Sequence, residues 1–226
     1  MLEIFGVPIS VHTRKVLVTA NAKGLEYRNE AVIPFDPPAD WHSLSPTGLI
    51  PAIAHDGYRL ADSAAICAYL EKLHPSPPLY PADPRGLGKA LWLERYGTDV
   101  LFRQVVHPLF TQKVIRPHIL QEGPPDEAEI GRVLQEIVPG VFGYLEDQAE
   151  GAFMVGAGFG IADITLACNL LNYQYLGFRL DAGRHPKLAD IFARSLATPP
   201  FQRAVQAEIP FVQKMGLDGS FLPQAA

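Results

Sequence analysis

Ser10 is the first residue whose type and place in the chain suggest chemistry. It lies where the apolar segment LEIFGV, residues 2–7, gives way to the helical pattern TRKVLVTANAK, residues 13–23. A hydroxyl at a helix N-terminus sits beside unpaired backbone NH groups and the positive end of the helix dipole. It can cap the helix, which is the commoner use of serine there, or donate a hydrogen bond to a substrate. Position alone leaves both interpretations open.

A second feature is the turn SPTGLIP, residues 45–51, which delivers Ile50 and Pro51 to the head of a short strand. Only about 5 to 6% of X-Pro bonds in folded proteins are cis, so the sequence does not predict a cis bond here. If the bond is cis, the main chain of Ile50 faces outward. Its NH and carbonyl groups can then pair with an extended, peptide-like ligand, as an added strand does.

Asp62 and Ser63 open a later helix in the segment LADSAAI. Both are ordinary helix-capping residues, but a helix N-terminus also binds a carboxylate through its NH groups and a serine hydroxyl. Asp62 is then placed to hold an ammonium group. An α-amino acid carries both charges on one carbon, so this pair suits the α-amino acid end of a ligand.

The elements that must position these residues form two kinds of unit. Residues 2–7 and 25–33 read as strands, residues 13–23 as an amphipathic helix, and Asp56-Gly57 as a hairpin turn between two further strands. A helix beginning at Asp62 ends at the breaker HPSPPLYPADP. Residues 1–80 therefore form an α/β unit, and a linker lies near residues 81–88. Every long segment after it repeats apolar residues at helical spacing, which predicts an all-helical second domain over residues 88–226.

Composition excludes several classes of protein. The chain has 226 residues, 48% of them hydrophobic and 19% charged, with a formal charge of −5. This describes a soluble globular protein whose charge content leaves room for a buried subunit interface. Without a long basic run, nucleic acid is not an expected partner. No leader-like segment opens the sequence and no long apolar run follows, so we expect a cytoplasmic protein without a membrane contact.

Other site types are also disfavoured by spacing. The segment GAGFGIADITLA, residues 156–167, has glycines at every second position and does not match the G-x-G-x-x-G loop of dinucleotide-binding proteins. The seven histidines are dispersed, so no metal site is expected. Ser10 has no G-x-S-x-G elbow around it. Cys67 and Cys168 lie in apolar runs and are expected to be buried thiols.

Taken together, the serine after the first strand, the turn SPTGLIP, the Asp-Ser pair in LADSAAI and the later G…IADI box resemble the cytosolic glutathione transferases. The resemblance covers nearly the whole chain, and SVHTRKV looks most like the serine-type, bacterial-like members. It implies a thioredoxin-like glutathione-binding domain over residues 1–80. It also implies an all-α helical bundle over residues 88–226 that contributes the electrophile site, and a homodimer.

The resemblance also assigns roles to individual residues. Ser10 matches the catalytic serine that hydrogen-bonds the glutathione sulfur, and Ile50 and Pro51 match the residue whose backbone pairs with the cysteinyl part and the cis-proline. Asp62 and Ser63 match the pair that binds the γ-glutamyl end. For the glycyl carboxylate, the candidate in PFDPPADWHSL is His42. Glutathione is the co-substrate, and no metal is implied. Candidates for the second-substrate site are Tyr96, Arg103, His107 and Phe110.

Two positions depart from the family pattern. Val11 stands where bacterial members commonly have proline, and Gly160 replaces the serine or threonine of the capping box before Asp163. The second change removes one reciprocal hydrogen bond, although glycine is a tolerated N-cap. The implied function is a detoxifying transferase that conjugates glutathione to a small hydrophobic electrophile. Isomerase, dehalogenase and disulfide reductase activities remain open, as does a non-catalytic glutathione-binding role.

Overall fold

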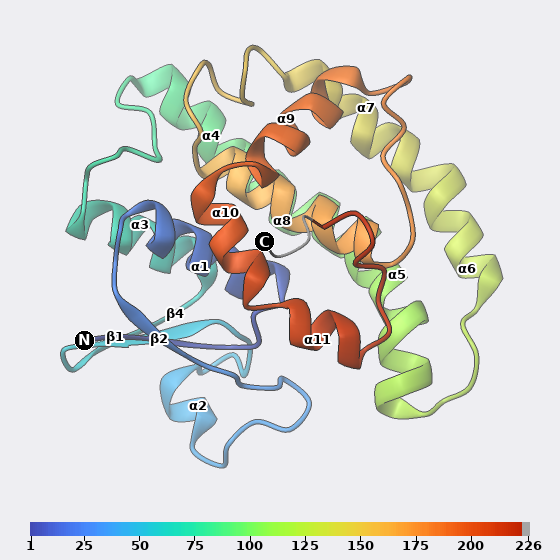
Figure 1. Ribbon diagram of the computed structural model, residues 1–226, viewed down its shortest axis with the longest axis horizontal. Helices are drawn as coiled ribbons and strands as arrows, with labels where there is room; N and C mark the ends of the chain where they lie inside the picture. The colour runs from blue at the N-terminus through green and yellow to red at the C-terminus, as the bar shows by residue number, and fades with distance from the viewer. Residues whose placement is uncertain (223–226) are drawn as a thin grey trace. The chain divides into compact units, whose positions relative to one another are not determined.

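The chain divides into two compact units in the computed structural model, which describes residues 1–222 (Figure 1). The first unit contains Met1–Tyr80 together with Ala197–Ile209, and the second contains Pro81–Leu196 and the chain from Pro210 onward. This differs from the division expected from sequence, in which residues 88–226 form one helical domain. The segment Ala197–Ile209 belongs to the first unit because its helix packs on the first helix of that unit.

A four-stranded sheet forms the centre of the first unit. Its strands are β1 (Leu2–Phe5), β2 (Tyr27–Glu30), β3 (Ala52–His55) and β4 (Tyr58–Ala61), in the order β2-β1-β3-β4. β1 and β2 are parallel and the other two pairs are antiparallel. The predicted hairpin is present, with positive φ angles of 49° at Asp56 and 86° at Gly57, as a tight two-residue connection requires.

The strands are shorter than the sequence suggests. β1 ends before Gly6, whose φ of 145° leaves the extended conformation that L residues adopt. β2 covers only Tyr27–Glu30 of the predicted residues 25–33, because its register pairs it with the four residues of β1 alone. β2 thus begins opposite Leu2 and ends opposite Phe5.

Helices of the first unit cover both faces of the sheet. They are α1 (Val11–Ala22), α2 (Trp41–Leu44), α3 (Ser63–Leu73) and α10 (Pro199–Gln206). α1 packs against both α3 and α10, and α10 lies beside it in Figure 1. α1 is not the amphipathic helix expected from its sequence, because Arg14 and Lys15 are as buried as its apolar residues. α10 packs along α1, and Arg14 contacts Glu208, which follows α10.

The second unit is built from helices. A nearly continuous helical run consists of α4 (Pro84–Tyr96), a stretch of wider π-helical turns (Gly97–Val106), α5 (His107–Phe110) and a second such stretch (Thr111–Leu120). α6 (Glu127–Arg132), a short π-helical stretch (Val133–Ile137) and α7 (Val138–Gln148) follow, then α8 (Ile161–Tyr175), α9 (Pro186–Leu196) and α11 (Ile209–Lys214). α8 is buried along almost its whole length and forms the core of this unit.

The start of α8 compensates for the glycine at its N-cap. One oxygen of Asp163 accepts the NH of Gly160 at 2.9 Å, and the other accepts the NH of Met154 at 2.7 Å. The aspartate half of the capping box is therefore present, and Met154 supplies a second partner for the carboxylate. Burial raises the pKa of Asp163 to about 6, although these backbone NH groups oppose the rise.

Two further predictions concern the cysteines and membrane-spanning segments. Cys67 and Cys168 are buried thiols, as expected, and form no disulfide within residues 1–222. Within residues 1–222, none of the helices is long and apolar enough to cross a membrane.

Candidate functional site

Three of the predicted site segments adjoin the sheet at the same edge, meaning the same end of strands β1, β3 and β4. Phe5, the last residue of β1, pairs with Ala52, the first residue of β3, and Ala52 pairs with Ala61, the last residue of β4. Ser10 follows β1 in the chain, Ile50-Pro51 directly precedes β3, and Asp62-Ser63 directly follows β4. All three segments therefore adjoin the paired residues Phe5, Ala52 and Ala61. The register therefore brings together segments that are up to 53 positions apart in sequence, from Ser10 to Ser63.

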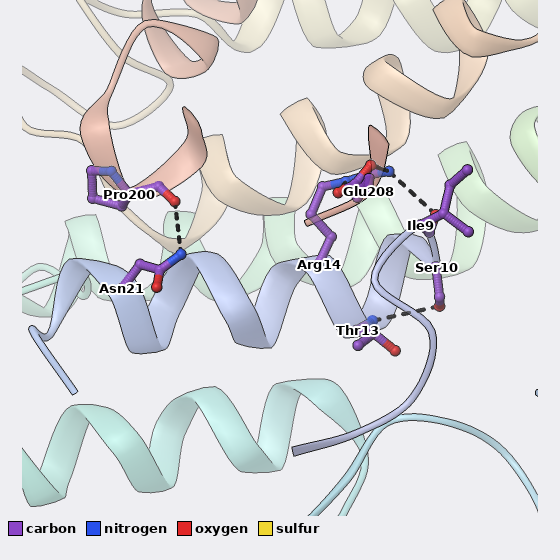
Figure 2. A network of polar contacts seen from close by, with 7 residues as sticks. All are labelled: Ile9, Ser10, Thr13, Arg14, Asn21, Pro200 and Glu208. Carbon is purple, nitrogen blue, oxygen red and sulfur yellow. Dashed lines mark hydrogen bonds and ion pairs between the residues drawn. The ribbon is translucent and has the colours of Figure 1, made fainter. Parts of the chain in front are cut away.

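Ser10 is the N-cap of α1. Its Oγ accepts the NH of Thr13 at 3.5 Å (Figure 2), a long separation for a hydrogen bond of this kind, which is typically about 2.9–3.0 Å. Its own NH donates to the carbonyl of Val7 at 3.1 Å. In the cap the hydroxyl acts as an acceptor, and in the described part of the chain its proton has no acceptor. The proton is therefore available to a ligand.

Gly6 connects the end of β1 to both α1 and the Ile50-Pro51 turn. A methyl group in place of its hydrogen would overlap Thr13 Oγ1 and would lie 3.2 Å from the Cβ of Ile50. The first turn of α1 and Ile50 thus contact the same point of the main chain. This proximity places the Ser10 helix end next to the turn that precedes β3.

The Ile50-Pro51 peptide bond is cis. The Ile50 side chain is buried among Val32, Trp41 and Ala52. Among residues 1–222, its NH and carbonyl take no part in the backbone hydrogen bonds found outside helices and strands. The turn before it is braced by Ser45, whose hydroxyl donates to the carbonyl of Leu49 at 2.6 Å. Within residues 1–222, the NH and carbonyl of Ile50 are therefore left at this bend without a backbone partner.

His42 lies in α2, beside the same turn. Its exposed ring packs on Gly48, where an added Cβ would lie 2.9 Å from the ring carbon Cε1. The neighbouring Trp41 is buried and donates its indole NH to the carbonyl of Gly48 at 2.9 Å. Trp41 therefore anchors α2 to the turn, and His42 is held at its outer side.

Asp62 and Ser63 form the start of α3. Asp62 is an exposed N-cap with a positive φ of 79°, and its Oδ1 accepts the NH groups of Ala64 and Ala65 at 2.9 and 3.0 Å. Those two amides are therefore already satisfied by the protein. The NH and hydroxyl of Ser63, with Oδ2 of Asp62, are the groups left for a ligand. They comprise two donors and a negatively charged acceptor next to each other.

The candidate second-substrate residues all belong to the second unit. Tyr96 stacks on Tyr144 with ring centroids 4.5 Å apart, Arg103 faces Asp99, and His107 lies against Phe102. Burial raises the pKa of Tyr96, and partial desolvation lowers the pKa of His107. Phe110 is half-buried.

A cavity of about 320 Å³ in the same unit has a different lining. Lys113, His118, Tyr175, Met215 and Asp218 contribute to it, and none of the four predicted residues does. The sequence analysis did not identify these side chains. They come from three separate places, namely the long helical run, the end of α8 and the last segment of the chain, and no local sequence signal connects them.

Sequence reasoning also missed a buried ion pair next to Ser10. Arg14 of α1 contacts Glu208, which follows α10 and lies 194 positions later in the chain (Figure 2). Both side chains are fully buried. Nothing in the segment TRKV indicates a buried arginine, because the partner belongs to a distant segment. Within residues 1–222, no group of three or more His, Cys, Asp or Glu side chains is arranged to hold a metal ion.

Several known proteins are similar to this chain in sequence. Residues 4–78 match the family described as glutathione S-transferase, N-terminal domain. A glutathione S-transferase of Triticum aestivum is 28% identical over 210 residues, which cover 92% of this chain and 94% of that protein. A probable maleylacetoacetate isomerase of Vibrio cholerae is 29% identical over 220 residues, which cover 92% and 97%.

The fold is also that of solved glutathione S-transferases. The crystal structure of a glutathione S-transferase from Rhodospirillum rubrum F11 superposes with a TM-score of 0.81 at 25% identity, over 90% of this chain and 91% of that one. The predicted fold, a thioredoxin-like α/β unit followed by a helical region, is confirmed. The comparisons thus show similarity to the N-terminal domain of glutathione S-transferases over residues 4–78, and to glutathione S-transferases and a probable maleylacetoacetate isomerase over most of the chain.

Proposed function

We propose that this protein is a glutathione S-transferase of the serine type, which conjugates the glutathione thiolate to a small, hydrophobic electrophile. One observation carries the proposal. The Ser10 hydroxyl caps α1 only as an acceptor and keeps its proton for a ligand, at the sheet edge from which Ile50-Pro51 and Asp62-Ser63 also project.

The groups at this edge match the groups of glutathione in kind and order. Oδ2 of Asp62 and the Ser63 hydroxyl and NH suit the ammonium and carboxylate of the γ-glutamyl end. The main chain of Ile50, whose NH and carbonyl have no backbone partner within residues 1–222, suits the peptide groups of the cysteinyl residue, as an added strand does. His42, outside the turn, is the candidate for the glycyl carboxylate. The sulfur then faces Ser10.

The energies required are modest. A free thiol has a pKa of about 8.5, so only about 3% is thiolate at pH 7. Lowering the pKa by about two makes it roughly three-quarters ionised and requires about 2.7 kcal/mol of differential stabilisation. A hydrogen bond to a charged sulfur supplies about 1.5–3 kcal/mol, and a helix N-terminus about 0.3–1 kcal/mol. Ser10 and the first turn of α1 are sufficient together, and no general base is needed.

In the proposed step Ser10 remains neutral. The glutathione thiol releases its proton to solvent, and the Ser10 hydroxyl donates a hydrogen bond to the resulting thiolate. The sulfur lone pair attacks the electrophilic carbon and forms a carbon–sulfur bond. With an aryl halide, the halide ion leaves with its bonding electrons, and the product is a thioether. One glutathione is consumed for each halide released.

The test combines binding and turnover. Glutathione should raise the melting temperature of the wild type, and a generic aryl chloride should be conjugated with one chloride released per glutathione consumed. Ser10→Ala should lose at least about tenfold in turnover while its glutathione-induced shift stays close to that of the wild type. Unchanged turnover in the variant would refute the role of Ser10. Binding without turnover on a panel of electrophiles would favour a non-catalytic glutathione-binding protein.

A second candidate is a glutathione-dependent isomerase. It is favoured by similar proteins named as maleylacetoacetate isomerases, among them those of Vibrio cholerae and Pseudomonas aeruginosa, at 29% and 28% identity. There the thiolate adds to a conjugated double bond, rotation follows, and the same thiolate leaves, so glutathione is not consumed. Measuring glutathione alongside product separates the two: loss of one thiol per product indicates conjugation, and constant thiol indicates isomerisation.

We further propose a cytoplasmic homodimer that acts in detoxification. The resemblance implies the dimer, and exposed apolar side chains offer surface for it in both units, at Tyr58 and Leu73 and at Leu91 and Trp92. Light scattering coupled to gel filtration should give the mass of two chains. A mass of one chain at micromolar concentration would overturn the dimer without bearing on catalysis.

A further inference from the structure

We infer that Arg14 and Glu208 act as a positioning pair for Ser10, holding the peptide unit that sets the direction of its hydroxyl. The inference rests on the proposed role of Ser10 as the donor to the thiolate. It adds two residues that do not touch glutathione in that proposal and assigns a functional task to the segment Ala197–Ile209.

The pair is rigid and isolated from solvent. Nη2 of Arg14 donates to Oε2 of Glu208 at 2.6 Å, and Nε donates to Oε1, so the contact is bidentate. Neither side chain has any exposed surface. A bidentate guanidinium–carboxylate contact defines the orientation of the arginine fork as well as its distance. The position of the guanidinium is thus determined by Glu208.

Arg14 in turn holds the main chain on both sides of Ser10. Its Nη2 donates to the carbonyl of Ile9 at 3.2 Å (Figure 2). Its backbone NH donates to the carbonyl of Ser10 at 2.8 Å. The Ile9 carbonyl belongs to the same planar peptide unit as the NH of Ser10, which donates to Val7 at 3.1 Å. Both polar ends of that peptide unit are therefore held, and with them the Cα–Cβ direction of Ser10.

The partner segment is attached to α1 at both ends. Near the other end of α1, Nδ2 of Asn21 donates to the carbonyl of Pro200 at 3.0 Å (Figure 2). Glu208 itself is placed by its NH, which donates to the carbonyl of Val205 at the end of α10. The segment thus spans the length of α1 and meets it at Arg14. Of these two attachments, only the one at Arg14 reaches the Ser10 peptide.

A purely structural role for this pair is a weak explanation. Two charges lose their hydration when buried, and replacing a buried ion pair by apolar residues of similar volume is often neutral or stabilising. The contact that an apolar pair cannot reproduce is the hydrogen bond to the Ile9 carbonyl. Arg14 and Glu208 can be replaced together by apolar residues, which avoids leaving one charge buried without its partner.

The experiment compares Arg14→Met/Glu208→Leu with a matched control, Lys23→Met/Glu71→Leu. Lys23, the C-cap of α1, and Glu71 of α3 form another ion pair, with exposed side-chain fractions of 0% and 13%, at the end of α1 away from Ser10. Glutathione-dependent melting shifts report binding, and turnover of an aryl chloride is measured from pH 6 to 9. Rates are normalised to the fraction of chains that bind glutathione, so loss of folded protein does not count.

The Arg14/Glu208 variant should keep its KM for glutathione within about threefold and lose at least about fivefold in kcat near pH 6.5, since small misplacements of a reacting group have large effects. Its pH profile should move upward, because the misdirected hydroxyl stabilises the thiolate less. The control variant should keep the wild-type profile. In the Ser10→Ala background, the Arg14/Glu208 change should cause no further loss.

Each contrary result has its own meaning. If Ser10→Ala lowers turnover and the Arg14/Glu208 variant keeps the wild-type kcat and pH profile, the positioning role is wrong and the proposed function stands. An equal shift in the control variant would also overturn the positioning role, because α1 as a whole would then be responsible. If Ser10→Ala leaves turnover unchanged, the proposed role of Ser10 is wrong, and the positioning role that rests on it is wrong with it.

Discussion

The hydroxyl of Ser10 accepts the amide of Thr13 at 3.5 Å, so the same oxygen that caps α1 retains its proton for a ligand. A helix cap uses a serine as an acceptor, whereas stabilising a thiolate uses it as a donor. The two uses are compatible in one side chain. The long separation further indicates that the cap itself contributes little to stability.

This relationship predicts that activity and stability separate at Ser10. Ser10→Ala should lose at least about tenfold in turnover, while its free energy of unfolding falls by no more than about 0.5–1 kcal/mol, at the low end for an N-cap. Ser10→Thr keeps a hydroxyl and is the control, with turnover above that of the alanine variant. Urea titration and the aryl chloride assay measure the two quantities. A large loss of stability with unchanged turnover would mean that the residue is a cap only.

At Asp62 the cap and the proposed ligand contact can be separated by two substitutions. Asn is as good an N-cap as Asp, so Asp62→Asn should retain the bonds to Ala64 and Ala65 and most of the stability. It removes the charge that faces the ammonium, and glutathione affinity should fall by roughly tenfold, as for loss of a charged hydrogen bond. Asp62→Ala should lose about 0.5–2 kcal/mol of stability as well. Isothermal titration that finds equal affinity in Asp62→Asn and wild type would remove Asp62 from the binding site.

Gly6 should tolerate no side chain. Gly6→Ala places a methyl group on Thr13 Oγ1 at a residue with φ of 145°, so both overlap and backbone strain oppose it. We expect a loss of stability of at least about 2 kcal/mol and a displaced first turn of α1 with reduced turnover. Gly24→Ala is the control, because its φ is also positive, at 65°, and its surroundings are open. It should lose only about 1 kcal/mol and keep full activity. Equal melting temperatures for the two variants would show that the contact at Gly6 is not tight.

Asp163 should make the stability of the protein depend on pH in an unusual direction. Burial raises its pKa to about 6, above the value of about 3.9 in an unfolded chain. Between about pH 4 and 6 the folded state binds more protons than the unfolded state, so this group lowers the free energy of unfolding as pH rises through that window. Its favourable contribution is complete below about pH 4 and lost above about pH 6.

The comparison with Asp163→Asn isolates this effect, because asparagine does not titrate and the other carboxylates cancel in the difference. The stability of the wild type relative to the variant should fall by up to on the order of 3 kcal/mol between about pH 4 and 7. Denaturant titrations at several pH values measure it. A difference that rises with pH would mean that the bonds from Met154 and Gly160 outweigh burial and hold the carboxylate ionised.

Much of the first unit was predictable because its signals are local. The hairpin at Asp56-Gly57 depends on residues that accept positive φ, and the helix starts at Ser10 and Asp62 depend on side chains that reach NH groups two or three positions ahead. Alternating and helical spacings then place the strands and helices in order. The sheet register, by contrast, was not visible in any one segment, and it is what brings the Ser10, Ile50 and Asp62 segments to one edge.

The sequence by itself determined the class of fold and the order of its elements, because periodicity, caps and turns act over a few residues, and the family resemblance added the roles of the candidate site residues. The tertiary structure alone decided that Arg14 is buried, that Ala197–Ile209 joins the first unit, and that Lys113 and His118 line a cavity while Tyr96 and Arg103 do not. The physical reason is separation along the chain. An arginine next to Ser10 is a surface residue or a buried one depending on a carboxylate 194 positions away, and no local pattern carries that information.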